Sequence, residues 1–247
     1  MNKLIIDVGN TNIKLGNFID GKLTKTKILP TKLYSFNNLK KKIDGVNYQQ
    51  VYVGSVVKEL DKQILRDIKN ITKLQLKMIR AIDFKKEFNL SKFNVNEIGT
   101  DILGLATILK KLYKNAVGIS FGTATFAVAV KCKRIMGVVI ASSIEMGIHQ
   151  LNTTTSLIKN KLLVDTAKAS SLEFGKDTNS AINSGASHMA RGFISSVYDY
   201  AKTKYHINQM VLTGGKTIYL HDIDKLKHIK LLDNAVLLGY YELSQTI

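Results

Sequence analysis

The sequence predicts an α/β protein built from two similar lobes with a cleft between them, and three observations support this. The chain has 247 residues, enough for one large domain or two compact ones. Short apolar runs typical of buried strands alternate with segments of helical periodicity. The strand and glycine turn at residues 6–9 (Ile-Asp-Val-Gly) recur as Ile-Ser-Phe-Gly at 119–122, nearly half a chain later. We therefore expect a first lobe over residues 1–113 and a second over 114–247.

The first lobe is expected to open as a β-hairpin. An apolar run at 4–9 ends in a Gly-Asn-Thr turn, and the chain then continues as a hairpin with a turn near Asp20-Gly21. Apolar residues at helical spacing predict a helix over 101–112, which puts Asp101 at or just before its N-terminus. The other elements expected in this lobe are a short helix at 39–43 and strands at 50–57 and 74–79.

The second lobe repeats the opening pattern of strand, glycine turn and strand over residues 116–130. The elements expected after it are a strand at 136–142, a helix at about 144–158, a turn at 175–177, a long helix at about 178–205, a strand at 209–215 and a closing helix near 234–243.

The formal net charge of +17 raises the question of a nucleic-acid partner. The kind of cation argues against one, because only four of the 36 basic residues are arginines, and base and phosphate recognition favours the arginine fork. The lysines are also spread along the chain, with no aromatic ladder that could stack bases. A small anionic ligand is therefore the better prediction, and a nucleic-acid-binding protein stays as an alternative class.

Several other classes lack their sequence signals. The chain has neither a Walker A loop nor the dinucleotide G-x-G-x-x-G pattern, no G-x-S-x-G elbow and no paired histidines for zinc, and Cys132 is its single cysteine. The start lacks the long apolar stretch of a signal peptide, and no run approaches about 18 apolar residues. We therefore expect a cytoplasmic protein that does not cross a membrane.

The two glycine turns are candidate phosphate cradles. A glycine turn after a buried strand can point backbone N–H groups into one concavity. The first turn adds Asp7, a carboxylate placed to bind Mg²⁺ through water, and Lys14, which could neutralise a phosphate. A tight hairpin with a solvated acid would explain one such turn. The pair, together with Gly214-Gly215 after a third strand, favours phosphate binding and a nucleotide such as ATP.

Asp101 and Thr178 each allow two interpretations. Asp101 follows a glycine that lets the backbone approach a ligand, but aspartate is also a common helix N-cap. Thr178 follows Gly-Lys-Asp, so it is either an N-cap or a hydroxyl offered to an anionic group at a helix terminus.

Six motifs in order resemble those of type III pantothenate kinases, members of the acetate and sugar kinase/Hsp70/actin superfamily with an actin-like ATPase (ribonuclease H-like) fold. The resemblance covers essentially the whole chain. The matching segments are Asp-Val-Gly-Asn-Thr-Asn-Ile-Lys at 7–14, Ser-Val-Val at 55–57, Gly-Thr-Asp at 99–101, Phe-Gly-Thr-Ala-Thr at 121–125, Gly-Lys-Asp-Thr at 175–178 with Ser-Gly at 184–185, and Thr-Gly-Gly at 213–215.

The resemblance implies ATP-dependent phosphorylation of pantothenate, the first step of coenzyme A synthesis, by a homodimer that needs Mg²⁺ and a monovalent cation such as K⁺ or NH₄⁺. Asp101 would be the general base, and the second lobe would carry the dimer interface. The residues that would bind ATP and its Mg²⁺ are Asp7, Val8, Gly9, Asn10, Thr11, Asn12, Ile13, Lys14, Gly122, Thr123, Gly214 and Gly215. Those that would bind pantothenate are Gly99, Thr100, Asp101, Ile102 and Thr178.

Four positions depart from the family pattern. Ile102 stands where the family has an arginine that helps to hold the pantothenate carboxylate. Ser120 replaces the aspartate that ligates the monovalent cation, so it can coordinate one only through a neutral oxygen. Ser142 and Ser143 replace a Pro-Gly pair. A second hypothesis is therefore a relative that binds nucleotide but is non-catalytic, an accessory regulator, or acts on another acceptor.

Overall fold

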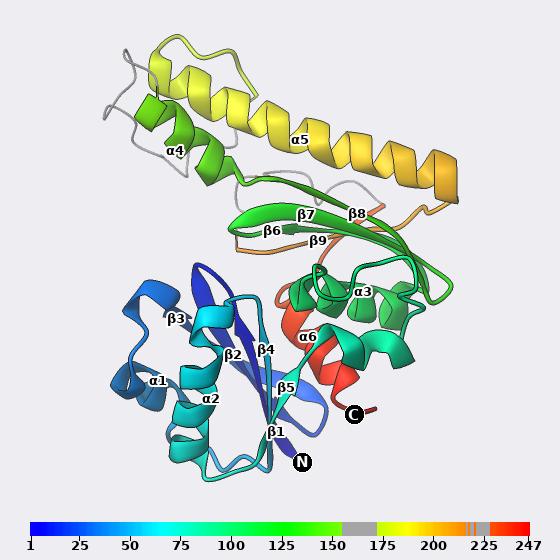
Figure 1. Ribbon diagram of the computed structural model, residues 1–247. Coiled ribbons are helices and arrows are strands. Elements are labelled where there is room, and N and C mark those ends of the chain that lie inside the picture. The colour runs from blue at the N-terminus through cyan, green and yellow to red at the C-terminus, as the bar shows by residue number, and fades with distance from the viewer. Residues whose placement is uncertain (155–171, 216, 218–219, 221–227) are drawn as a thin grey trace. The chain divides into compact units, whose positions relative to one another are not determined.

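The protein, described here from a computed structural model over residues 1–154, 172–215, 217, 220 and 228–247, folds as two compact units (Figure 1). Unit 1 comprises Met1–Lys111 together with Asn234–Ile247, and unit 2 comprises Leu112–Asp233. The described residues of each unit form one five-stranded mixed sheet.

The sheet of unit 1 begins with the predicted hairpin, in which β1 and β2 pair antiparallel and β2 pairs with β3. Asp20 and Gly21 form the β2–β3 turn with φ angles of 46° and 87°, the left-handed geometry that two-residue hairpin turns favour. β4 then pairs parallel to β1, and β5 to β4. The strand order is β3-β2-β1-β4-β5, with bounds Asn2–Val8 (β1), Asn12–Ile19 (β2), Lys22–Pro30 (β3), Gln50–Ser55 (β4) and Leu76–Ile79 (β5).

Four α-helices cover this sheet, with α1 and α2 on one face and α3 and α6 on the other (Figure 1). Successive side chains of β1 project to opposite faces of the sheet. Leu4, Ile6 and Val8 join the core with residues of α1 and α2, so Lys3, Ile5 and Asp7 lie on the face of α6. The helices are α1 (Phe36–Ile43), α2 (Lys58–Thr72), α3 (Thr100–Tyr113) and α6 (Ala235–Leu243), with short 3-10 segments at Thr31–Leu33 and Ala81–Lys86.

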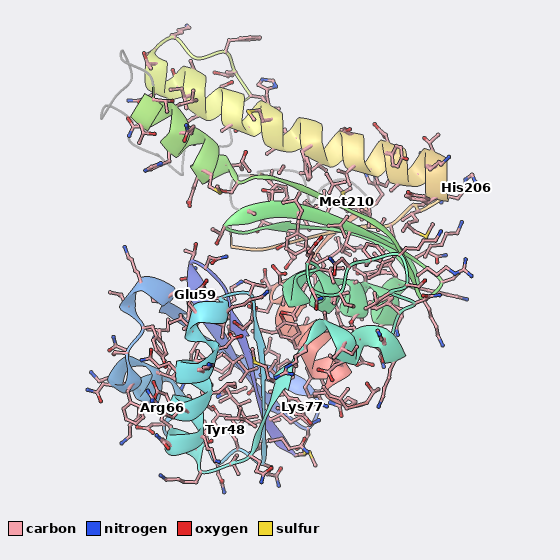
Figure 2. The ribbon with its side chains drawn as sticks, in the orientation of Figure 1. Tyr48, Glu59, Arg66, Lys77, His206 and Met210 are labelled. Atoms are coloured by element: carbon pink, nitrogen blue, oxygen red, sulfur yellow. The ribbon has the colours of Figure 1, made fainter. Side chains whose placement is uncertain are left out.

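Helix α2 has no counterpart among the predicted elements. Its Ile64 and Ile68 are fully buried, four residues apart on one face, while charged side chains such as Glu59 and Arg66 project from it (Figure 2). Periodicity of this kind is the usual signal of an amphipathic helix, so the element was accessible to sequence reasoning.

Unit 2 repeats the sheet of unit 1 strand for strand. The order β8-β7-β6-β9-β10 has the same antiparallel and parallel pairings as β3-β2-β1-β4-β5, and both hairpins carry a register shift between their second and third strands. The predicted pair of similar lobes is therefore confirmed at the level of topology. The strands are β6 (Asn115–Phe121), β7 (Ala124–Lys131), β8 (Arg134–Ser142), β9 (Met210–Thr213) and β10 (Ile229–Leu231).

Helices α4 (Ile144–Thr154) and α5 (Thr178–Tyr205) lie on one face of the second sheet (Figure 1). The predicted end of α4, residues 155–158, lies outside the described residues. The predicted bounds of α5 agree with the structure, and His206 ends it in a left-handed conformation with φ of 56° (Figure 2). Met210 then opens β9 in the core of this unit (Figure 2).

The last 14 residues differ from the predicted domain division. The sequence predicts them in the second lobe, but α6 packs on β1 and β2 and belongs to unit 1. Packing explains this placement: Tyr240 is fully buried there, and Lys3 of β1 donates from Nζ to the Ser244 carbonyl at 3.1 Å. The predicted boundary at residue 113 lies two residues from the observed end of the first segment, Lys111.

Candidate active site

Asp7 lies near the end of β1, on the sheet face that α6 covers. Lys14 of β2 is its partner in the antiparallel pairing, and Gly54 of β4 is its partner on the parallel side. Directly opposed residues of neighbouring strands project on the same side of a sheet, so Lys14 shares a face with Asp7. On the other side, Gly54 makes room for the ring of Tyr240, which a Cβ atom at this position would overlap.

Asp101 lies in the first turn of α3, where a negative charge is favourable near the helix N-terminus. Its Oδ1 accepts a hydrogen bond from the N–H of Ile102 at 2.9 Å. Since α3 begins at Thr100, Asp101 lies inside the helix. The interpretation of Asp101 as the helix N-cap is therefore wrong. Thr100 donates from Oγ1 to the Ser55 carbonyl at 3.2 Å, so the start of the helix is tied to the end of β4.

Gly99 allows the Asp101 side chain to adopt this position. A Cβ atom added at Gly99 would overlap Oδ1 of Asp101, while the next nearest atoms are in ordinary contact. Any other residue at 99 would therefore push the carboxylate aside.

Both carboxyl groups have raised pKa values, and that of Asp7 also responds to the charge of Asp101. Burial, followed by the charge of Asp101, raises the pKa of Asp7 from 3.8 to about 7, and Lys14 only partly offsets this. Burial also raises the pKa of Asp101, although the hydrogen bond from the N–H of Ile102 acts in the opposite direction. Two nearby carboxyl groups with raised pKa values fit a bound divalent cation. Its positive charge would offset the cost of burying a carboxylate and the repulsion that Asp101 exerts on Asp7.

The raised pKa of Asp7 predicts a pH dependence of stability. A carboxyl that holds its proton better in the folded state stabilises the fold below pH 3.8, and this contribution disappears as pH rises to about 7. We expect Asp7→Asn without ligands to unfold at a higher temperature than the wild type at pH 8. In free energy of unfolding, the difference is about 2 kcal/mol. It is smaller than the pKa shift alone would give, because Asp7 is partly exposed to water.

Thermal unfolding of both proteins between pH 4.5 and pH 8 measures this effect. The gain should shrink towards low pH, where both side chains are uncharged. A difference that stays constant over this range would contradict the raised pKa.

The first glycine turn follows β1 directly. The N–H of Gly9 donates to the Asn12 carbonyl at 3.0 Å, and Thr31 donates from Oγ1 to the Gly9 carbonyl at 2.7 Å. Asn10 and Thr11 at its tip are exposed. Val8 and Ile13 on either side are fully buried in the core, so only their backbone could approach a nucleotide.

The second turn has the same position in unit 2. The N–H of Gly122 donates to the Ala124 carbonyl at 3.2 Å, and Thr123 is exposed. Gly214, after β9, has φ of 104° and approaches the backbone of Phe121 so closely that a Cβ there would overlap it. The structure thus brings Gly122, Thr123 and Gly214 together, with exposed Gly215 following in sequence.

The residue before the second turn, Ser120, is buried at the end of β6 and pairs with Thr213 of β9. Thr178 is exposed and occupies the first position of α5. It is not the N-cap: Asp177 takes that role and accepts a hydrogen bond from the Ser180 N–H at 3.0 Å. Among the described residues, no group of three or more His, Cys, Asp or Glu side chains could hold a metal, and no helix could cross a membrane.

A family model described as type III pantothenate kinase matches residues 3–200. This chain belongs to the type III pantothenate kinase family. A type III pantothenate kinase of Malacoplasma penetrans is 32% identical over 246 residues, covering 96% of this chain and 94% of the relative. Another, of Mycoplasma mobile, is 31% identical and covers 97% of this chain and 98% of the relative.

The fold of this chain is similar to that of several solved structures. A conserved Baf family protein from Campylobacter jejuni superposes with a TM-score of 0.62 at 18% identity, covering 98% of both chains. A ROK hexokinase from Thermus thermophilus gives a TM-score of 0.52 at 14% identity, covering 98% of this chain and 97% of the other. The predicted fold of the actin-like ATPase type, with two similar lobes, is confirmed.

Two residues of the candidate site in this type III pantothenate kinase family member were not among the predicted ones. Gly54 and Tyr240 lie beside Asp7 and Thr100, and a Cβ at Gly54 would overlap the Tyr240 ring. A glycine inside a buried strand signals close approach of another group and could have indicated the first. The second carried no signal, because its partners are distant in sequence.

Proposed function

We propose that this protein transfers the γ-phosphoryl group of ATP to the primary hydroxyl of pantothenate, the first step of coenzyme A biosynthesis. The observation that carries the proposal is the pair of carboxylates, Asp7 and Asp101, on one face of the unit 1 sheet in a chain of this family. One carboxylate suits a metal-bound polyphosphate, and the other suits the acceptor hydroxyl.

In this reaction Asp101 accepts the hydroxyl proton as the oxygen forms a bond to the γ-phosphorus. The bond between that phosphorus and the oxygen bridging to ADP breaks, which releases ADP and 4′-phosphopantothenate. A carboxyl whose pKa is raised is a stronger base than an ordinary aspartate, which favours this role. Most of the acceleration comes from alignment and charge neutralisation, as in other phosphoryl transfers.

Asp7 would hold Mg²⁺ through water. When bound, the ion supplies positive charge to the phosphate oxygens of ATP. Residues 9–14, Gly122, Thr123, Gly214 and Gly215 supply phosphate contacts in this proposal, with Val8 and Ile13 contributing only backbone groups. Gly99, Thr100 and Thr178 contact pantothenate. The buried side chain of Ile102 cannot replace the charge of an arginine, so a lysine must hold the pantothenate carboxylate.

ADP release in a coupled assay tests the acceptor directly. Pantothenate, pantetheine and related alcohols are compared, each with and without K⁺, because Ser120 offers a monovalent cation only a neutral oxygen. Release that depends on pantothenate supports the proposal. ADP release with another alcohol, but not with pantothenate, would identify a different acceptor. Nucleotide binding in calorimetry without turnover would identify an accessory regulator.

We also propose that unit 2 forms a homodimer with a second copy of the chain. Its strand β8 and helices α4 and α5 carry large apolar side chains that are more than half exposed, among them Ile140 (66%), Met146 (52%) and Met189 (71%). Exposed apolar surface of this kind commonly marks an interface.

Ile140→Lys is expected to convert the dimer to a monomer, because it would bury an unpaired charge in that interface. Light scattering after size-exclusion chromatography measures the mass. Ile28→Lys, at a 48% exposed position of unit 1, is the matched control and should stay dimeric. A monomeric wild type, or an Ile140→Lys dimer, would contradict this interface.

A further inference from the structure

Tyr240 of α6 is fully buried within unit 1, where two glycines make room for its ring and a third lets α6 approach α3. A Cβ at Gly54 would overlap its ring, and one at Gly104 of α3 would lie 2.9 Å from it. A Cβ at Gly239 would overlap the backbone of Gly104, so α6 and α3 meet at paired glycines. The ring therefore lies against both β4 and α3.

The hydroxyl of Tyr240 reaches the start of α3. It donates to Oγ1 of Thr100 at 3.0 Å, and Thr100 in turn donates to the Ser55 carbonyl at 3.2 Å. These two consecutive hydrogen bonds join α6, α3 and β4 through buried side chains. Thr100 immediately precedes Asp101, so the bonds fix the backbone from which that carboxylate projects.

Two carboxylates lie close enough to Tyr240 for their charges to affect its hydroxyl. Asp7 is the strand partner of Gly54, on which the Tyr240 ring packs, and Asp101 follows Thr100. Burial, and then the charges of Asp7 and Asp101, raise the pKa of Tyr240 well above its ordinary value. The phenol consequently stays protonated and remains a hydrogen-bond donor across the physiological range.

We propose that Tyr240 is a positioning residue, which holds Asp101 in place by fixing Thr100 at the start of α3. The assignment rests on the proposed function for its effect on catalysis. That Tyr240 fixes Thr100 at the start of α3 does not depend on the proposed function, because the contacts of Tyr240 involve no substrate.

Tyr240→Phe tests this role, since it keeps the ring and removes only the donor. We expect kcat with pantothenate to fall about tenfold, as for the loss of one positioning hydrogen bond, while KM for ATP changes less than twofold. Amide hydrogen exchange at Ile102 and Leu103 should become faster. Tyr241→Phe, the same change at the next residue, whose ring stacks on Phe18, is the control and should alter neither readout.

A coupling measurement isolates the bond to Thr100. Thr100→Val should slow the enzyme, Thr100→Ser should restore it, and Tyr240→Phe combined with Thr100→Val should be no slower than Thr100→Val alone. If Tyr240→Phe does not fold, the Thr100 pair tests the same bond from its other end.

The outcomes separate the two proposals. A kcat within twofold of the Tyr241→Phe control, or unchanged exchange at Ile102 and Leu103, would overturn the positioning role. If the wild type does not phosphorylate pantothenate, the proposed function fails and hydrogen exchange alone decides the role of Tyr240.

Discussion

Replacing Asp101 by asparagine is expected to lower kcat for pantothenate by about 10²- to 10⁴-fold, the range in which general bases contribute. Asparagine matches aspartate in shape and can still accept the Ile102 N–H through Oδ1. It cannot take up the hydroxyl proton. The change therefore removes the base while leaving the start of α3 in place, and initial rates at saturating ATP and pantothenate measure it.

Calorimetry provides the control for this variant. Affinity for ATP with Mg²⁺ should be equal to or higher than that of the wild type, because one of two neighbouring carboxylates has lost its charge. Turnover equal to that of the wild type would remove Asp101 from the mechanism.

Gly99→Ala is expected to reduce kcat by about 10²-fold although it adds only one methyl group. The new Cβ would overlap Oδ1 of Asp101, so the carboxylate must move, and displacements near 1 Å in an active site cost about this much in rate. The unfolding temperature should change little, because the overlapped atom belongs to a side chain that can rotate away. Steady-state kinetics and thermal unfolding together measure both expectations.

Gly192→Ala in α5 is the matched control, since nothing lies within 4 Å of a Cβ at that position. It should keep full activity and gain slightly in stability, as alanine favours helix over glycine. The double variant Gly99→Ala/Asp101→Asn should be no slower than Asp101→Asn alone, because both changes act on one carboxylate. Additive losses would show that Gly99 acts elsewhere.

Of the described elements, local patterns predict every strand except β10 and every α-helix except α2. β1, β2 and α5 follow from alternation, turn residues and capping that neighbouring residues determine. The repeat of residues 6–9 at 119–122 predicted the duplicated topology, because each copy ends the central strand of its sheet and begins the turn that follows. By contrast, the unit to which α6 belongs depends on contacts between residues far apart in the sequence, those of Tyr240 with Thr100 and of Lys3 with Ser244.

The candidate site was predictable in its residue types but not in its geometry. Asp7 and Asp101 could be named from motifs. Their proximity, and the burial that is the main cause of the raised pKa of Asp7, required the folded unit. The N-cap at Asp177 in place of Thr178 shows the same limit, since adjacent residues compete for one role. Ile102 departs from the family motif in a way that the sequence shows, but its burial results from the packing of α3, which the motif does not contain.

Phosphorus NMR of the reaction products tests the central claim most directly. With ATP, Mg²⁺ and pantothenate, the wild type should produce a new phosphomonoester in equal amount to ADP, and the Asp101→Asn variant should produce almost none. Formation of ADP with inorganic phosphate, unchanged when pantothenate is omitted, would contradict phosphoryl transfer to pantothenate.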